Sequence, residues 1–289
     1  MRVAELRAGG EVDGIFACSR KDRLTTKAGT PYLAVELRDR TGAIPARAFR
    51  DADFLAAGFE RGDLVRVRGR VERFRDELQV ELRSIVRVQE GDADPAEFLP
   101  VAYRDMEELD GFLEHLAREV HDGDLRALLD LFLGDDAFRA ELRRTPCTRG
   151  GHHAYLGGLI EHTVAVATLA VETCTLHPRL NSDLLVTAAI LHDVGKLREF
   201  ELGADIDLSD AGAMVGHVVL GQQMVVERAA RLDRFPADKL NALVHCILGH
   251  HGAENLPGRR FRSAEAVALY RLNAVDASVK AALEHGLPS

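Results

Sequence analysis

The chain has 289 residues, of which 46% are hydrophobic and 29% are charged, so it is long and apolar enough for two globular domains of ordinary size. Its formal net charge of -9 excludes general, non-specific attraction to polyanions, and any contact with nucleic acid then needs a local basic patch or a metal ion. The charge is divided unevenly. Residues 1–92 hold 18 Lys and Arg against 16 Asp and Glu, whereas residues 93–289 hold 19 against 30.

The cysteines are scattered and form no CxxC pair, which argues against a disulfide framework and against a zinc ribbon. The first residues lack the apolar segment of a signal peptide. We see no apolar run close to the roughly 18 to 20 residues that cross a bilayer, so no membrane contact is expected. These features predict a cytoplasmic protein.

Five short segments in the first 90 residues have the pattern of β-strands: residues 11–18, 32–39, 43–49, 64–74 and 76–88. Apolar and polar residues alternate along them, and turn residues separate them. One helical or irregular piece, residues 51–60, interrupts the series. This order predicts a small all-β barrel of the OB type, a fold that binds single-stranded nucleic acid on one face and with two loops.

The stretch YLAVELRDRTGAIPARAF resembles the central strands of nucleic-acid-binding OB domains of the anticodon-binding type. The resemblance implies binding loops near residues 20–27 and 73–76. The alternative is that the charged residues are solvated surface and that the aromatic residues belong to the core, because alternation buries one face of every strand. The predicted phosphate contacts are Arg20, Lys21, Arg23, Lys27, Arg73 and Arg75, and the predicted stacking residues are Tyr32, Phe49 and Phe74.

Acidic residues and two prolines mark residues 91–100 as a linker, and the pattern is helical from residue 105 onward. We therefore predict an OB domain over residues 1–92, lead-in helices over residues 93–144, and an all-α helical bundle over residues 145–289. Within the bundle, residues 201–213 have few apolar positions and are expected to form a loop.

The predicted helix of residues 184–191 is followed directly by His192 and Asp193. These adjacent residues place an imidazole and a carboxylate side by side at the end of the helix. Further His and Asp residues stand on neighbouring helices, and mixed ligands of this kind suit Mn, Fe, Co, Ni or Zn. Asp193 is the natural bridge between two metals, and Lys196 would neutralise charge on a phosphate. Any one of these histidines alone is more often a packing residue. The predicted ligands are His162, His192, Asp193, His217, His250 and Asp276, with His251 and Asn273 left open, and His152 and His153 are weaker candidates for substrate contact.

The stretches HHAYLGGLIEHT, ILHDVGK, VGHV, ILGHHG and EAVALYRLNAVDA resemble the HD superfamily of metal-dependent phosphohydrolases over roughly residues 145–285. The order of domains is most similar to the bacterial 3'-to-5' exoribonucleases of the YhaM type. The resemblance implies two divalent metals, manganese or cobalt above all, and metal-hydroxide attack that releases nucleoside 5'-monophosphates. Its implied partner is single-stranded RNA or DNA, and a homo-oligomer is an open possibility.

Two departures from the family pattern keep other functions open. The family tends to have D-x-x-D in the last helix, where this chain has Asn273 and Asp276, so either residue could be the last ligand. The stretch PCTRGG also differs from the family version. The alternatives are a small-nucleotide or cyclic-nucleotide phosphohydrolase, and a nucleic-acid-binding regulatory protein with a weakened HD site.

Overall fold

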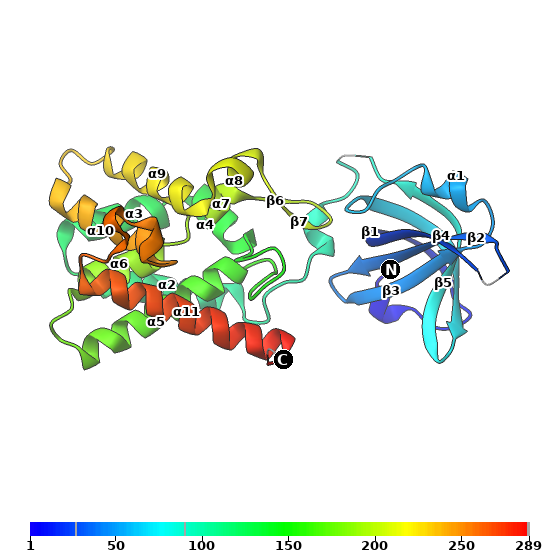
Figure 1. Cartoon of the computed structure of the whole chain (residues 1–289), viewed down its shortest axis with the longest axis horizontal. Coiled ribbons are helices and arrows are strands. Elements are labelled where there is room, and N and C mark those ends of the chain that lie inside the picture. The colour runs from blue at the N-terminus through cyan, green and yellow to red at the C-terminus, as the bar shows by residue number, and fades with distance from the viewer. Residues whose placement is uncertain (27, 90, 288–289) are drawn as a thin grey trace. The chain divides into compact units, whose positions relative to one another are not determined.

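The structure is a computed structural model that describes residues 1–26, 28–89 and 91–287. It divides into two compact units, one formed by residues 1–100 with 202–207 and the other by residues 101–201 with 208–289. The first unit contains a β-barrel and the second consists largely of helices (Figure 1). The predicted all-β barrel followed by an all-α bundle is therefore confirmed.

The barrel has five strands: β1 (Glu11–Thr25), β2 (Pro31–Asp39), β3 (Gly42–Ala48), β4 (Leu64–Phe74) and β5 (Glu77–Arg87). They close in the order β1-β2-β3-β5-β4, with β1 antiparallel to both β2 and β4 and with β3 parallel to β5. The short helix α1 (Ala52–Ala56) connects β3 to β4. This closed five-stranded barrel is the predicted OB fold.

Alternation along β4 separates the barrel core from its charged exterior. Val65, Val67 and Val71 are buried, and the arginines between them are exposed. Gly69 lies where the pairing with β5 shifts register, and a Cβ atom there would come within 2.3 Å of the Glu81 carbonyl oxygen. Glycine at this position therefore lets the strand bend against its neighbour. The high arginine content of the first 92 residues thus belongs to the surface of the barrel.

The helical unit begins with α2 (Met106–Arg118), α3 (Gly123–Leu133) and α4 (Asp136–Arg144). Asp105, Asp122 and Asp135 start these helices, and each carboxylate accepts hydrogen bonds from the first free backbone N–H groups. The core elements that follow are α5 (Gly158–Leu176), α6 (Ser182–Leu191), α7 (Lys196–Glu199), α8 (Asp210–Val215), α9 (His217–Ala229), α10 (Ala237–Gly249) and α11 (Ala264–His285).

Helix α6 is at the centre of this unit, and α5, α10 and α11 pack against it. All of its residues from Leu184 to Leu191 are buried. A helix that is apolar on every side needs neighbours all around it, and this is what places the residues at its end deep inside the unit. His192, the next residue, is fully buried.

Helix α5 corrects one expectation from the sequence. This helix of 19 residues is long enough and apolar enough on average to cross a membrane, although no such run was expected. Half of that stretch is buried inside the unit, and the helix contains the buried residues Glu161 and His162. The core helix of a soluble protein passes the same test.

Residues 201–213 do not form the loop that their composition predicts. Two short strands, β6 (Phe200–Leu202) and β7 (Ile206–Leu208), pair there as a two-stranded sheet, and α8 follows. The Gly203 N–H donates to the Asp205 carbonyl to close the turn, and the Ser209 hydroxyl accepts from the Gly212 N–H to start α8. This stretch is therefore ordered by backbone hydrogen bonds and by the burial of Ala204 and Ile206, despite its few apolar residues.

Candidate metal centre and nucleic-acid interface

The helix ends of the second unit bring four histidines and one aspartate to a common point. His162 projects from α5, and His192 and Asp193 follow the last turn of α6. His217 begins α9, and His250 ends α10. Gly195 allows α9 to approach this closely, because a Cβ atom there would lie 2.0 Å from the carbonyl oxygen of His217.

Asp193 is shared by two sets of nitrogens. Its Oδ2 atom lies 3.6 Å from His162 Nε2 and 3.4 Å from His192 Nε2. Its Oδ1 atom lies 3.4 Å from His217 Nε2 and 3.3 Å from His250 Nε2. The carboxylate therefore belongs to two groups whose ligand atoms all lie within 4.8 Å of one another: His162, His192 and Asp193, and Asp193, His217, His250 and His251.

The four rings are held with Nε2 toward Asp193. His192 Nδ1 donates to the Ala189 carbonyl at 2.8 Å, and His250 Nδ1 donates to the Ile247 carbonyl at 2.6 Å. Carboxylates hold the Nδ1 atoms of the other two rings: His162 pairs with Asp276 at 2.6 Å, and His217 pairs with Glu199 at 2.9 Å. This is the arrangement that metal-binding histidines adopt, because the second nitrogen fixes both the tautomer and the ring orientation.

Two buried atoms at the centre fit a divalent metal. Asp193 Oδ1 and His250 Nε2 have no hydrogen-bond partner among the described residues, although both are shielded from solvent. A buried polar atom without a partner is costly, and coordination to a metal would satisfy both atoms. Imidazole and carboxylate donors suit first-row transition metals, so the residues present fit two divalent ions with Asp193 between them.

The protonation of the centre also fits metal binding. Burial alone would raise the pKa of Asp193, but the Lys196 ammonium and the His192 ring hold it well below its usual range. Burial lowers the pKa of His162 to about 4, although the hydrogen bond with Asp276 opposes this shift. Burial also lowers the pKa of His250. The carboxylate is therefore charged and these two rings are neutral near neutral pH, as metal ligands must be.

Lys196 is predicted to act on a phosphate. In the structure its side chain is buried, and its ammonium group contacts other protein groups. Nζ lies 3.0 Å from Asp193 Oδ2, 2.7 Å from the Cys147 carbonyl oxygen and 3.5 Å from Cys147 Sγ. Burial would lower the pKa of Lys196, but the Asp193 carboxylate raises it overall. Its geometry favours holding Asp193 in place.

Asp276 lies behind the His162 ring. Its Oδ2 atom also accepts from His153 Nε2 at 3.1 Å, and His153 Nδ1 donates to the Tyr155 hydroxyl oxygen at 2.9 Å. The Tyr155 hydroxyl in turn donates to Glu161 Oε2. Burial would lower the pKa of His153, but Asp276 and Glu161 raise it overall, which is consistent with an imidazolium that donates from both nitrogens. Asp276 and His153 thus form one buried network with the α5 ligand.

The remaining candidates lie around the centre. Asn273 is buried and donates from Nδ2 to the carbonyl oxygen of His250. His251 is exposed, and its Nε2 lies 2.9 Å from His217 Nε2 at the open side of the site. His152 is half-buried beside Cys147, with 4.0 Å between Nε2 and Sγ. Sequence reasoning missed the supporting residues Cys147, Tyr155, Glu161 and Glu199, because nothing in their local pattern marks a contact with a distant helix.

On the OB barrel, aromatic and arginine side chains form one exposed cluster. Tyr32 and Phe49 stack with ring centroids 5.3 Å apart, and the Arg47 guanidinium lies 5.3 Å from the Phe74 ring centroid. The Arg75 guanidinium also lies 5.3 Å from the Phe74 ring centroid. Phe49 and Phe74 are 45% and 44% exposed, so these rings are surface rather than core. Arg47 was not predicted, although strand alternation places it on the same face as Phe49.

The other predicted phosphate contacts are partly engaged within the barrel. Arg20 pairs with Asp22, Arg23 with Asp53 and Arg73 with Asp76. Lys21 pairs with Glu60 and donates to the Phe59 carbonyl oxygen. Lys27 lies outside the described residues. Surface ion pairs of this kind are weak, and a phosphate could displace them.

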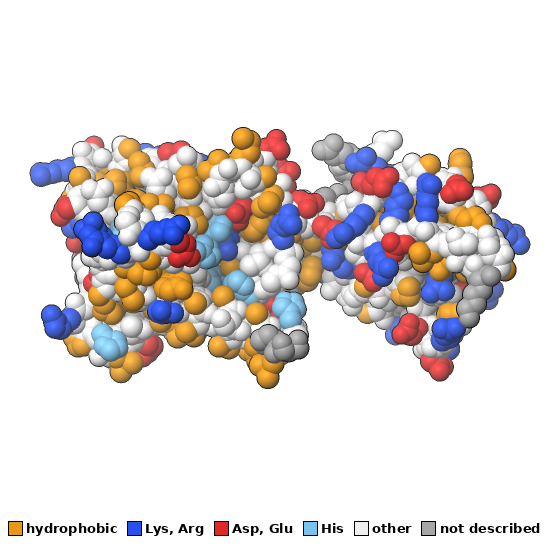
Figure 2. Space-filling model, in the orientation of Figure 1, with side chains coloured by type: hydrophobic (Ala, Val, Ile, Leu, Met, Phe, Trp, Pro, Cys, Tyr) orange, Lys and Arg blue, Asp and Glu red, His pale blue; other side chains and the backbone are white. Residues whose placement is uncertain are grey.

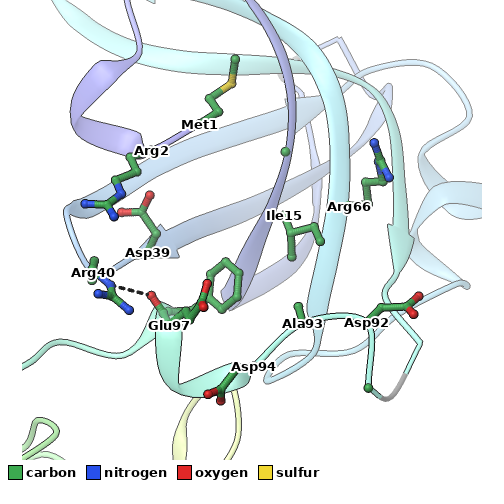
Figure 3. Close-up of a pocket in the computed structure, with 13 residues that line it drawn as sticks. Met1, Arg2, Ile15, Asp39, Arg40, Arg66, Asp92, Ala93, Asp94 and Glu97 are labelled. Carbon is green, nitrogen blue, oxygen red and sulfur yellow. Dashed lines mark hydrogen bonds between the residues drawn. The ribbon is translucent and has the colours of Figure 1, made fainter.

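The first unit also has an open cavity of about 780 Å³ away from this aromatic cluster (Figure 3). Arg2, Arg40 and Arg66 line it together with Asp39, Asp92 and other acidic residues, and Arg40 Nε donates to the Glu97 carbonyl oxygen. Because its lining contains both basic and acidic side chains, this cavity favours no particular ligand.

Comparison with known families agrees with this geometry. Residues 159–278 match the HD domain family, and residues 10–88 match a family described as an OB-fold nucleic acid binding domain. The chain is therefore an HD-domain enzyme that carries an OB-fold nucleic acid binding domain.

Several relatives align with most of this chain. A protein of Oceanobacillus iheyensis named 3'-5' exoribonuclease YhaM is 29% identical over 251 residues, which are 86% of this chain and 78% of the relative. The protein of the same name from Shouchella clausii is 26% identical over 278 residues, 94% of this chain and 85% of the relative. That of Listeria monocytogenes serotype 4b is 25% identical over 280 residues, 96% and 88% of the two chains.

Proposed function

We propose that this protein is a metal-dependent 3'-to-5' exoribonuclease that releases nucleoside 5'-monophosphates from single-stranded RNA. The observation that carries the proposal is Asp193, a buried carboxylate shared by two groups of histidines. Two bound divalent metals would supply activated water and would neutralise charge on the phosphate. The names of the relatives favour RNA as the substrate.

Each residue of the centre has a defined part in this proposal. His162 and His192 would hold one metal, His217 and His250 would hold the other, and Asp193 would be a ligand of both. His251 adds a ligand at the open side. Lys196 keeps Asp193 charged and oriented, and Asp276 orients His162 through its Nδ1 atom. The buried Asn273 supports the backbone of His250, so the ligand set does not depend on a carboxylate at that position.

The aromatic cluster of Tyr32, Arg47, Phe49, Phe74 and Arg75 is the proposed binding face for the RNA strand. Exposed rings stack on bases of any sequence, and the two guanidinium groups add positive charge beside the rings. This combination favours a polynucleotide over a small nucleotide as substrate. Incubation of the protein with single-stranded RNA and manganese, followed by mass spectrometry of the nucleotides released, tests the reaction, and a parallel single-stranded DNA tests the preference for ribose.

Replacing both exposed rings, Phe49→Ala/Phe74→Ala, is expected to weaken RNA binding about tenfold or more. The reason is that stacking contributes about 1–3 kcal/mol per base. Fluorescence anisotropy with a labelled 12-nucleotide RNA, in chelator to prevent hydrolysis, measures the affinity. Phe54→Ala is the matched control, because Phe54 is 82% exposed on the same barrel and has no ring contact among the described residues. Equal affinities for the two variants would rule out the proposed stacking face.

A further inference from the structure

We propose that a loop beside the metal centre, residues 257–262, binds the phosphates of the RNA strand next to the nucleotide being removed. This inference rests on the proposed exonuclease function. The loop, called here the arginine loop, has the sequence PGRRFR and follows the α10 histidines by only a few residues. Its three arginines are Arg259, Arg260 and Arg262.

The charge of the arginine loop is unusual for its surroundings. Residues 93–289 carry 19 basic against 30 acidic side chains, so the helical part of the chain repels a polyanion as a whole. Three of those 19 basic residues occupy four consecutive positions in this loop, residues 259–262. All three are exposed, and none has an ion pair among the described residues. Other arginines of the same unit, such as Arg139 and Arg143, are engaged by carboxylates.

Packing fixes the loop next to the metal ligands. The Leu256 and Phe261 side chains, which flank Arg259 and Arg260 in the sequence, contact Gly249, where an added Cβ atom would be 3.1 Å and 3.2 Å from them. Gly249 directly precedes His250. The Phe261 ring also stacks on Tyr270 of α11, with centroids 5.7 Å apart, and the Arg262 N–H donates to His245 Nε2 at 2.9 Å.

The exposed candidate ligand of the metal centre precedes this loop in the chain by six residues. His162, His192, Asp193 and His250 are buried, whereas His251 is exposed. His251 is also the ligand nearest to the arginine loop along the chain. Figure 2 shows histidine side chains at the surface of the helical unit, with Lys and Arg side chains nearby on the same face. In this proposal, a strand that enters on the side of His251 passes the arginines.

The backbone of the loop is held in a particular shape. Gly258 and Arg259 have φ values of 71° and 50°, so two successive residues adopt the left-handed conformation. Glycine adopts it freely, whereas an arginine there is uncommon and such residues cluster at ligand-binding sites. Exposed, unpaired guanidinium groups on a fixed loop suit phosphate oxygens, which arginine binds with two parallel hydrogen bonds.

The test compares Arg259→Ala/Arg260→Ala with a control variant that loses the same charge. Arg231 and Arg234 are exposed and lie beyond the far end of α9, about 20 Å from His217 at about 1.5 Å per residue, so Arg231→Ala/Arg234→Ala is the control. Each holoenzyme is assayed with a 12-nucleotide RNA and with bis(4-nitrophenyl) phosphate, a diester that has no neighbouring phosphate. The salt dependence of kcat/KM for RNA is measured as well.

We expect kcat/KM for RNA to fall at least tenfold more than kcat/KM for the small diester in the loop variant, chiefly through KM. The slope of log kcat/KM against log salt should become shallower by about 0.7 for each lost phosphate contact. The control should match the wild type. Equal losses on both substrates would indicate damage to the metal centre and would overturn the inference, as would RNA kinetics equal to the control. A wild type that hydrolyses the small diester but not RNA would instead refute the proposed function.

Discussion

Asp193→Asn/Lys196→Met is expected to eliminate hydrolysis of RNA, with a loss of about 10³-fold or more, because the two proposed metals would lose the ligand that they share. The double change removes the buried carboxylate and its buried ammonium partner together. Asp193→Asn alone would leave the Lys196 charge buried without its counter-ion, which is strongly destabilising. Metal content per protein, measured by mass spectrometry after dialysis, should fall from two ions toward none.

The matched control for this variant is Asp233→Asn, which removes an exposed carboxylate from the same unit. It should keep the metal content and the rate of the wild type. Circular dichroism spectra of all three proteins establish that the helical unit is folded. A folded double variant that still binds two metals would contradict the bridging position of Asp193.

Asp276→Asn is expected to weaken the binding of one metal about 10- to 100-fold, because the carboxylate orients the His162 ring. If Asp276 acts only in this way, a high concentration of manganese should restore two bound ions and most of the rate. Isothermal titration calorimetry of the metal-free protein measures both affinity and stoichiometry. The exposed residue Asp238 supplies a control carboxylate, and Asp238→Asn should bind metal as the wild type does.

The same titration distinguishes two roles for Asp276. A direct ligand would be lost in the variant, and one of the two ions would then be absent even at saturation. An unchanged affinity would show that the hydrogen bond to His162 has no effect on the metal. His153→Gln should produce a smaller loss than Asp276→Asn, because His153 contacts Asp276 and not the ligand ring nitrogen.

Much of the architecture was predictable because local pattern and tertiary packing agree. Apolar and polar residues alternate along the strands of the barrel, and the helices have apolar residues at the positions that face the core. His192 and Asp193 could be recognised because they follow a fully apolar helix without being needed to end it. Residues 200–208 show the limit of this reasoning, since they have few apolar positions and still pair as a two-stranded sheet.

The support around the metal centre could not be predicted, since it depends on contacts between distant segments. Glu199 fixes His217 across 18 positions, and Asp276 meets His162 across 114 positions. No periodicity connects such residues. The sequence placed Asp276 in the right region but could not show that its carboxylate faces the outer nitrogen of a histidine. The contact of Lys196 Nζ with the Cys147 carbonyl oxygen, across 49 positions, was hidden for the same reason.

The most direct test of the proposed function follows the polarity of digestion. Single-stranded RNA labelled at either the 5' or the 3' end is incubated with manganese and either the wild type or Asp193→Asn/Lys196→Met, and a chelator is added to a parallel wild-type sample. We predict that the 5'-labelled strand shortens stepwise, that the 3' label is released at once as a mononucleotide, and that the variant and the chelated sample leave both strands intact. Intact RNA with the manganese-loaded wild type, or 3'-labelled fragments that shorten gradually, would contradict the account.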